Sequence, residues 1–337
     1  MIQETIQSLV VRRHLSINEA HEAMKEIMDG KATPAQIGAF VTALHLKGET
    51  IEEISGMAQA MRESSLHVNT DGVVVDTCGT GGDSSGTFNI STTVGLVAAG
   101  AGVKVAKHGN RAMTGNCGSA DVLEALDVKL DLSPNGVETC LNEIGFGFMF
   151  AQTFHPSMRF AAGPRKEIGI RTVFNILGPL TNPAGAKNHL LGVSNPDVGE
   201  KIAHVLNQLG STRALIVHGM DGLDEITMCD STQVWDMQNQ TVKTYTVSPE
   251  FFGFDRATSD SLKSTGVKDS VKTLLNILSG KIGPSRDVVL MNTAATLVAA
   301  NKTETLKEGV SLAKESIDSG KAMGKLKSLI KLSQNLK

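Results

Sequence analysis

The chain has 337 residues, which is more than one compact core usually holds, so we expect two domains or lobes. Its net charge is −3 and it contains no dense basic block, so binding to nucleic acid or to a membrane surface has no electrostatic support. The N-terminus has no basic stretch ahead of an apolar core, and no run of about 18 apolar residues occurs; we therefore expect no signal peptide or membrane span, and a cytoplasmic protein.

The first part of the chain carries repeated signals for helix starts. Ser16-x-x-Glu19 and Thr50-x-x-Glu53 are capping boxes, in which a hydroxyl and a carboxylate satisfy free N–H groups of the first turn. Thr33-Pro34-Ala35-Gln36 combines a cap, a proline at the first helical position and a glutamine at the third. Three capped helices in succession predict a small helical domain over residues 1–70.

The pattern changes after Gly72. Short β-branched runs alternate there with helical segments, which predicts a largely parallel sheet covered by helices. The expected strands are 73–75, 103–106, 146–151, 190–193 and 214–218, and the expected helices include 94–101, 120–126, 134–144 and 196–209. Residues 233–237 and 242–247 predict an added hairpin, and the chain is helical again from 271. The predicted fold is α/β, with a small N-terminal helical domain and a larger domain over 71–337.

A glycine-rich loop, residues 79–83, follows the first expected strand. Its glycines allow positive φ and close approach to a ligand, and its N–H groups with those of the next helix start form an anion site. Donors follow at Thr87, Asn89, Ser91 and Thr92, which favours a phosphate-rich substrate. The loop lacks the Gly-Lys-Ser/Thr of a Walker loop and the third glycine of a dinucleotide fingerprint. A plain strand-to-helix turn is the alternative.

A second polar cluster, residues 107–111, follows the next expected strand. Open α/β sheets bind ligands at the carboxyl ends of their strands. Lys107 and Arg111 suit a diphosphate, whereas His108 and Asn110 suit an aromatic or carboxylate ligand. A solvated surface loop is the alternative interpretation.

A third cluster contains His155-Pro156 and Arg165-Lys166. Gly163-Pro164-Arg165 predicts a helix start from which Arg165 projects early, and arginine can bind a carboxylate through two hydrogen bonds. A surface ion pair with a nearby glutamate is the alternative for Arg165. Residues 175–183 contain several glycine, proline and asparagine residues, which break helices and strands. They predict an irregular connection that lines a cleft or crosses between lobes.

Two adjacent carboxylates, Asp224 and Glu225, follow the last expected parallel strand. Mg²⁺ binds one or two carboxylates together with substrate phosphates and water, so this pair beside a diphosphate loop predicts a Mg²⁺ site. A solvated acidic loop is the alternative. The four cysteines form no Cys-x-x-Cys pair, which argues against a zinc site and against a disulfide framework.

Together these segments resemble the anthranilate phosphoribosyltransferases, a family of the nucleoside phosphorylase-like transferase superfamily. The matching motifs keep the family order over nearly the whole chain: 79–83, 89–92, 107–111, 118–126, 155–156, 165–167, 171–183 and 224–225. The resemblance implies transfer of a phosphoribosyl group from phosphoribosyl diphosphate to the amine of anthranilate, with release of diphosphate, in tryptophan biosynthesis. It also implies Mg²⁺ as cofactor, an active site in the interdomain cleft, a homodimer formed through the helical domain, and helices from about 160–185 that join this domain.

The resemblance further implies roles for individual residues. The donor would lie on Gly79, Gly82, Asp83, Thr87, Asn89, Ser91, Thr92, Lys107 and Ser119. Mg²⁺ would be held by Ser91, Asp224 and Glu225. Anthranilate would be bound by Asn110 and Arg165, with His108, His155 and Gly178 along its path. Lys107, Asn110 and Arg165 are the expected catalytic residues, and the stretch 113–117, which departs from the common family pattern, is expected to form a mobile loop over the diphosphate.

Two other functions have less support from the sequence. A pyrimidine nucleoside phosphorylase of the same superfamily would carry a differently worded glycine loop and a nucleobase-binding set that this sequence lacks. A non-catalytic relative that binds nucleic acid would have a basic surface and damaged motifs, whereas this chain is slightly acidic and its motifs are intact. The expected catalysis is electrostatic, and a neutral aromatic amine needs no strong base, so no catalytic base is predicted.

Overall fold

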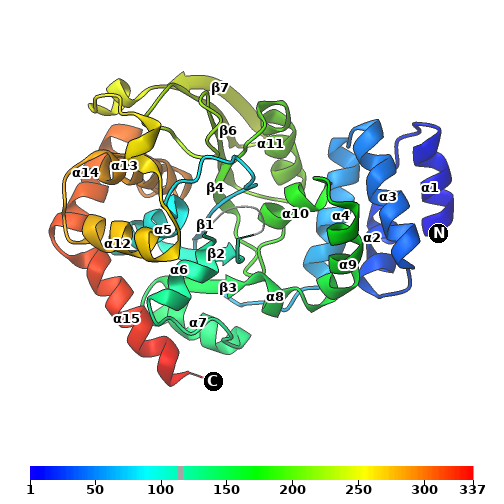
Figure 1. Cartoon of the computed structure of the whole chain (residues 1–337), viewed down its shortest axis with the longest axis horizontal. Coiled ribbons are helices and arrows are strands. Elements are labelled where there is room, and N and C mark those ends of the chain that lie inside the picture. The colour runs from blue at the N-terminus through cyan, green and yellow to red at the C-terminus, as the bar shows by residue number, and fades with distance from the viewer. Residues whose placement is uncertain (113–116, 337) are drawn as a thin grey trace.

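The computed structural model describes residues 1–112 and 117–336, so most of the expected loop 113–117 lies outside the described residues. A group of helices that includes the N-terminus lies beside a larger body built around a central sheet (Figure 1). No helix in the described ranges is both long and apolar enough to span a membrane.

All the N-terminal helices except the first begin where cap chemistry predicts. They are α1 (Ile2–Val10), α2 (Ile17–Met28), α3 (Pro34–Lys47) and α4 (Ile51–Glu63). Ser16, Thr33 and Thr50 each accept the backbone N–H of the residue three positions later, and complete capping boxes are present at all three. The three capped helices are therefore confirmed. Helix α1 was not predicted separately, because no side-chain cap marks its start.

The sheet has seven strands in the order β3-β2-β1-β4-β5-β6-β7. The first five are parallel: β1 (Val74–Gly79), β2 (Lys104–Gly109), β3 (Phe146–Phe150), β4 (Asn188–Gly192) and β5 (Arg213–Gly219). An antiparallel hairpin, β6 (Thr232–Gln238) and β7 (Thr241–Val247), extends the edge beyond β5. The mostly parallel sheet and the hairpin are thus confirmed. Strand order reverses at β1, and ligands of open α/β sheets bind beside such a point.

Helices cover both faces of the sheet, and further helices pack outside them. The helices after the N-terminal group are α5 (Ile90–Gly100), α6 (Ser119–Ala125), α7 (Pro134–Glu143), α8 (Ala151–Phe154), α9 (Arg159–Ile168), α10 (Phe174–Leu180), α11 (Gly199–Gln208), α12 (Val267–Leu278), α13 (Pro284–Ala299), α14 (Leu306–Asp318) and α15 (Lys321–Asn335). Helices α5 and α13 pack on the strands and on each other, and α14 and α15 pack outside α5. Helix α11 packs on β5 and β6 and also contacts α4 of the N-terminal group.

Two hydrophobic cores share the middle of the sheet between them. Leu215 and Val217 of β5 belong to the core that contains α5 and α13. Ala214 and Ile216 of the same strand belong to the other core, which contains α11 and the N-terminal helices. This alternation follows from the two-residue period of a strand. The N-terminal helices therefore bury their apolar side chains in one core with a face of the sheet.

The segment after β3 departs from the sequence prediction. A helix start near Pro164 was expected, but α9 begins at Arg159 and Pro164 lies inside it, so that prediction was wrong. Proline is tolerated there although it removes a helical hydrogen bond, because Ala161 and Pro164 are buried. Helix α9 packs against α2 and α3 (Figure 1). The breaker-rich run that follows contains a short helix, α10, with Leu177 and Leu180 in the second core.

Candidate active site

The glycine-rich loop leaves β1 at the centre of the sheet. Gly81 and Gly82 have φ of 64° and 73°, values that favour glycine. The N–H of Thr80 donates to the carbonyl of Gly192 at the end of β4 (2.9 Å). The N–H of Gly81 donates to Oδ2 of Asp224 (2.8 Å). The loop is thus tied directly to the acidic pair that lies 143 positions later in the chain.

Two glycines make room for Asp224. Gly79 and Gly192 are register partners at the ends of β1 and β4. A Cβ on Gly192 would lie 1.6 Å from the backbone oxygen of Asp224, and one on Gly79 would lie 2.4 Å from its Oδ2. Neither position can carry a side chain without displacing Asp224. The strand ends therefore form a cradle for this acid.

Asp224 and Glu225 are poorly solvated acids that face further negative charge. Burial, followed by the charge of Asp83, raises the pKa of Asp224 to about 7. Burial, followed by the charge of Asp224, raises the pKa of Glu225 well above its usual value. A bound cation would relieve this repulsion. Ionised carboxylates at this strand end hence favour a positively charged ligand.

The protein atoms near these acids supply only part of a Mg²⁺ coordination shell. Over residues 1–112 and 117–336, no three His, Cys, Asp or Glu side chains converge into a complete metal cluster. Asp224 and Glu225 supply two carboxylates, and the backbone of Ser91 hydrogen-bonds Glu225, which brings that serine beside them. Mg²⁺ commonly takes one or two carboxylates and completes its shell with substrate phosphates and water. The residues present fit such a shared site.

Lys107 of β2 is buried beside the same acids. Its side chain is 1% exposed, and its ammonium group donates to the carbonyl of Thr77 and to Oγ of Ser91 (3.1 Å). Burial lowers the pKa of Lys107, while the neighbouring charge of Asp76 opposes this effect. The hydrogen bonds of the Lys107 ammonium group are therefore made to protein atoms in this conformation.

The start of α5 presents the hydroxyls that the sequence singled out. Asn89 precedes the helix, and its Oδ1 accepts a short hydrogen bond from Oγ1 of Thr92, which is fully buried. The carbonyl of Ser91 accepts from Oγ1 of Thr77 on β1 (3.1 Å). Asp83 and Thr87 are linked through Oγ of Ser85, at 2.6 and 3.4 Å. Asn89, Ser91 and Thr92 thus lie at a helix N-terminus, which favours anions.

A second group lies at the end of β2 and is neutral. The rings of His108 and His155 lie 4.9 Å apart between centroids, and both residues are buried. Burial lowers the pKa of His108 to about 3 and that of His155 to about 4. A hydrogen bond joins His108 to the backbone of Gly178 in α10, and another joins His155 to that of Thr181. The Nε2 atoms of both rings are buried and have no partner among the described residues.

Arg165 and Asn110, the residues predicted to bind the acceptor, make different contacts. The guanidinium of Arg165 lies 5.0 Å from the ring centre of Phe174 at the start of α10, and burial lowers its pKa. No ion pair of Arg165 is found within the described ranges, so the predicted alternative of a surface pair has no support. The carbonyl of Asn110 accepts from Oγ of Ser119 (3.3 Å), which joins the end of β2 to α6.

Comparison with known proteins places this geometry in a family. The glycosyl transferase family α/β domain matches residues 71–323, and the helical bundle domain of the same family matches residues 3–65. The anthranilate phosphoribosyltransferase of Dehalococcoides mccartyi is 52% identical over 338 residues, which cover 100% of this chain and 99% of that protein. The chain belongs to the anthranilate phosphoribosyltransferase family.

Solved structures of anthranilate phosphoribosyltransferases have the same fold. The enzyme from Thermus thermophilus superposes with a TM-score of 0.94 and 41% identity, covering 98% of this chain and 99% of that one. The enzyme from Saccharomyces cerevisiae in complex with PRPP (phosphoribosyl diphosphate) and Mg superposes with a TM-score of 0.92 and 30% identity, covering 99% of this chain and 98% of that one.

Two features of this anthranilate phosphoribosyltransferase-family chain escaped sequence reasoning. Nη1 of Arg171 donates to the carbonyl of Gly81 (3.0 Å), and a Cβ on Gly82 would lie 1.5 Å from that Nη1. Ser194 also donates to the carbonyl of Gly81 (3.0 Å). The local sequence gives no sign of these contacts, because the residues that they join are about 90 or more positions apart. Arg111, expected near a diphosphate, is instead paired with Asp121 and Glu124.

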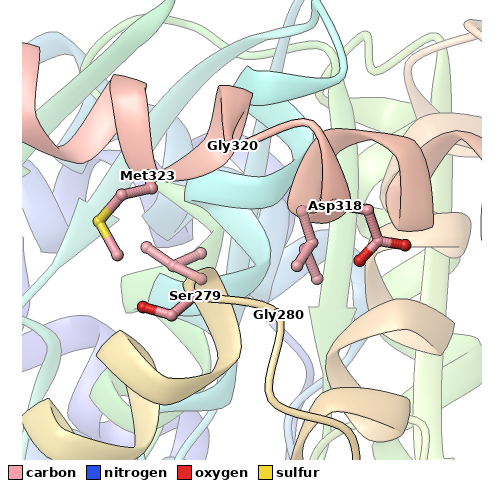
Figure 2. A pocket seen from close by; sticks show the side chains of 7 residues that line it. Ser279, Gly280, Asp318, Gly320 and Met323 are labelled. Carbon is pink, nitrogen blue, oxygen red and sulfur yellow. The ribbon is translucent and has the colours of Figure 1, made fainter.

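A pocket also exists away from these groups. It has a volume of about 450 Å³ and lies where α12, α14 and α15 meet (Figure 2). Its lining is Leu278, Ser279, Gly280, Ile317, Asp318, Gly320 and Met323. The one carboxylate among them, Asp318, is paired with Arg286 (2.6 Å). None of the residues predicted for the active site lines this pocket.

Proposed function

We propose that this chain transfers the phosphoribosyl group of phosphoribosyl diphosphate to the amine of anthranilate, a step of tryptophan biosynthesis. The observation that carries the proposal is the pairing of two unlike sites at the ends of β1 and β2. One is acidic and lined by hydroxyls around Asp224 and Glu225. The other is neutral and lined by His108 and His155. The 52% identity, over the full length, to a relative named anthranilate phosphoribosyltransferase supports the same reaction.

The acidic site is proposed to bind the donor. Its proposed contacts are Gly79, Gly82, Asp83, Thr87, Asn89, Ser91, Thr92, Lys107 and Ser119. Backbone N–H groups of the loop and of the α5 start would face the diphosphate. Lys107 would offset the charge of Glu225 and orient Ser91, to which it already donates. Mg²⁺ bound by Ser91, Asp224 and Glu225 would neutralise charge on the departing diphosphate.

The neutral site is proposed to bind anthranilate. Arg165 would orient its carboxylate, with Asn110 beside it, and His108, His155 and Gly178 would line the path. Both histidines are neutral near pH 7, so they add no positive charge beside the aromatic amine, which is itself unprotonated at that pH. The amine nitrogen then bonds to C1 of the ribose as the bond from C1 to diphosphate breaks, and the nitrogen releases one of its protons to the departing diphosphate or to water. The protein contributes orientation and charge stabilisation, so no residue is assigned as a base.

The assembly and the domain division are also proposals. We propose a helical domain of residues 1–70, joined by helices from about 160–185, an α/β domain of 71–337, and a homodimer formed through the helical domain. Val10, Val11 and Leu46 are exposed by 68%, 76% and 69%, at the ends of the contacting helices α1 and α3. Apolar exposure of this kind suits an interface. Sedimentation of the Val11→Asp variant as a monomer would support this interface, and an unchanged dimer would exclude Val11 from it.

The reaction is tested by following anthranilate fluorescence with the purified full chain. Loss of signal that needs protein, phosphoribosyl diphosphate and Mg²⁺ together supports the transferase. No loss while the protein still binds the donor would point to another acceptor, and phosphorolysis of thymidine would point to a nucleoside phosphorylase. No loss and no donor binding would overturn the proposal.

The metal role has its own test. Asp224→Asn and Glu225→Gln should raise the Mg²⁺ concentration needed for half-maximal rate by about 10-fold or more, because each removes a charged ligand. Direct Mg²⁺ or Mn²⁺ titration of the donor complex gives a readout besides activity. Unaltered titrations in both variants would exclude these carboxylates as metal ligands.

A further inference from the structure

Strands β1 and β2 separate before they end. Their parallel register contains only two pairs, Val74 with Lys104 and Val75 with Val105. The ladders on their other sides run further, since β1 pairs with β4 as far as Gly79, and β2 pairs with β3 as far as Gly109. We call this parting of β1 and β2, beyond Val75 and Val105, the β1–β2 fork. It begins where the predicted site residues lie.

Three buried side chains bond the backbone groups that this fork leaves without strand partners. Asp76 accepts the N–H of His108 through Oδ1 (3.2 Å). Lys107 donates to the carbonyl of Thr77, and Asn182 donates to the carbonyl of Ala106 (2.8 Å). The residues Asp76, Lys107 and Asn182 are 0%, 1% and 2% exposed. Because buried N–H and C=O groups need partners, these side chains replace the missing ladder.

The same side chains connect three elements. Asn182 follows α10 in the chain and donates from Nδ2 to Oδ2 of Asp76 (2.7 Å), while its Oδ1 accepts the N–H of Ala184 (2.9 Å). Helix α10 carries Gly178, whose backbone bonds His108. The fork therefore ties β1 and β2 to the end of α10.

The fork also divides the two sites. Lys107 and His108 are consecutive in β2, so their side chains point to opposite faces. Lys107 reaches Ser91 at the start of α5, whereas His108 reaches Gly178 and His155. Any change in the position of β2 relative to β1 would move both groups at once.

We propose that Asp76 and Asn182 are positioning residues that hold the β1–β2 fork open and thereby place His108 and Lys107 in their two sites. This inference rests on the proposed function for its kinetic readout. Asp76 accepts from opposite sides through its two oxygens, and an amide accepts through one oxygen only. Asp76→Asn must therefore lose the bond to His108 or the bond to Asn182. Asn182→Ala, a second variant, removes the link to Ala106.

The experiment compares these variants with a matched control. Glu53→Gln makes the same chemical change in the helical region, where Glu53 is fully buried and pairs with Lys47 (2.8 Å). We expect Asp76→Asn to raise the KM for anthranilate at least 10-fold and the KM for the donor at least threefold, because a shift of β2 moves His108 and Lys107 together. Asn182→Ala should raise both KM values in the same way. Glu53→Gln should lower thermal stability without changing either KM.

Amide hydrogen exchange supplies a readout that needs no substrate. Asp76→Ala removes both acceptor oxygens, so exchange at the N–H of His108 should quicken at least 10-fold in this variant, relative to exchange at the N–H of Ile216 in β5. If the wild-type protein were inactive but the variant still showed faster exchange at His108, the proposed function would be overturned. The hydrogen-bonding role of Asp76 at the β1–β2 fork would still be supported. An active wild type with unchanged KM values in both Asp76→Asn and Asn182→Ala, or a rise in only one of the two KM values, would overturn the positioning role.

Discussion

The acidic donor site and the neutral acceptor site are built in different ways. At the donor site, backbone geometry holds charged groups together: Gly79 and Gly192 leave the space that Asp224 occupies, and Gly81 hydrogen-bonds its carboxylate. At the acceptor site, burial keeps His108 and His155 uncharged. Added volume therefore disrupts the first site, whereas the second depends on the burial that keeps its two histidines uncharged.

The largest expected effect tests the backbone cradle. Gly192→Ala places a methyl group 1.6 Å from the carbonyl oxygen of Asp224, so Asp224 must move. We expect kcat/KM to fall by about 100-fold or more, and the free energy of unfolding to fall by about 1–3 kcal/mol. Gly324→Ala is the control, because its Cβ in α15 would meet no atom within 4 Å. Equal activity of the two variants would show that the cradle does not position Asp224.

A smaller effect is expected from the carboxylate contact at the acceptor site. Arg165→Ala should raise the KM for anthranilate by about 10-fold to 100-fold, with little change for the donor, because a charge-assisted pair is lost. Arg165→Lys should recover only part of the loss, because lysine cannot make the two-point contact. Steady-state kinetics with each substrate varied separately checks the prediction. An unchanged anthranilate KM in the alanine variant would remove Arg165 from this role.

The pH dependence of stability tests burial at the acceptor site. The pKa of His155 is about 4 in the folded protein and about 6.5 when unfolded, so the unfolded chain binds the proton first as the pH falls. The resulting contribution is fully present above pH 6.5 and is lost between pH 6.5 and 4, reaching about 3 kcal/mol. Denaturant unfolding of His155→Asn should show a shallower fall over this window. His204→Asn, at a half-exposed site on α11, should follow the wild type.

The smallest effect concerns the contact that sequence reasoning missed. Arg171→Ala removes one hydrogen bond to the carbonyl of Gly81 from a largely exposed side chain. We expect the KM for the donor to rise by about 3-fold to 10-fold, because the glycine loop loses a side-chain tether that it shares with Ser194. Arg256→Ala is a control, since that arginine pairs with Asp230 and Glu250 on the surface. A rise in the anthranilate KM alone would assign Arg171 to the other site.

Local chemistry explains why much of the fold was predictable. Capping boxes at Ser16, Thr33 and Thr50 depend on residues three positions apart, and the glycine loop depends on backbone freedom within one turn. Helix α9 was misplaced because the burial of Ala161 and Pro164 by distant helices outweighed the usual preference of proline for a first turn. The sequence motifs identified the candidate site residues. They did not predict that Lys107 is buried, because burial depends on distant parts of the chain.

The sequence by itself determined where helices start, where the sheet region begins, and which loops carry glycine, hydroxyl and carboxylate groups, because those properties depend on near neighbours. Only the tertiary structure decided that Gly79 and Gly192 together enclose Asp224. It also decided that Asp76 and Asn182, 106 positions apart, replace backbone hydrogen bonds between β1 and β2. Both arrangements depend on how parallel strands are ordered and where they part, and strand order follows from packing over the whole chain.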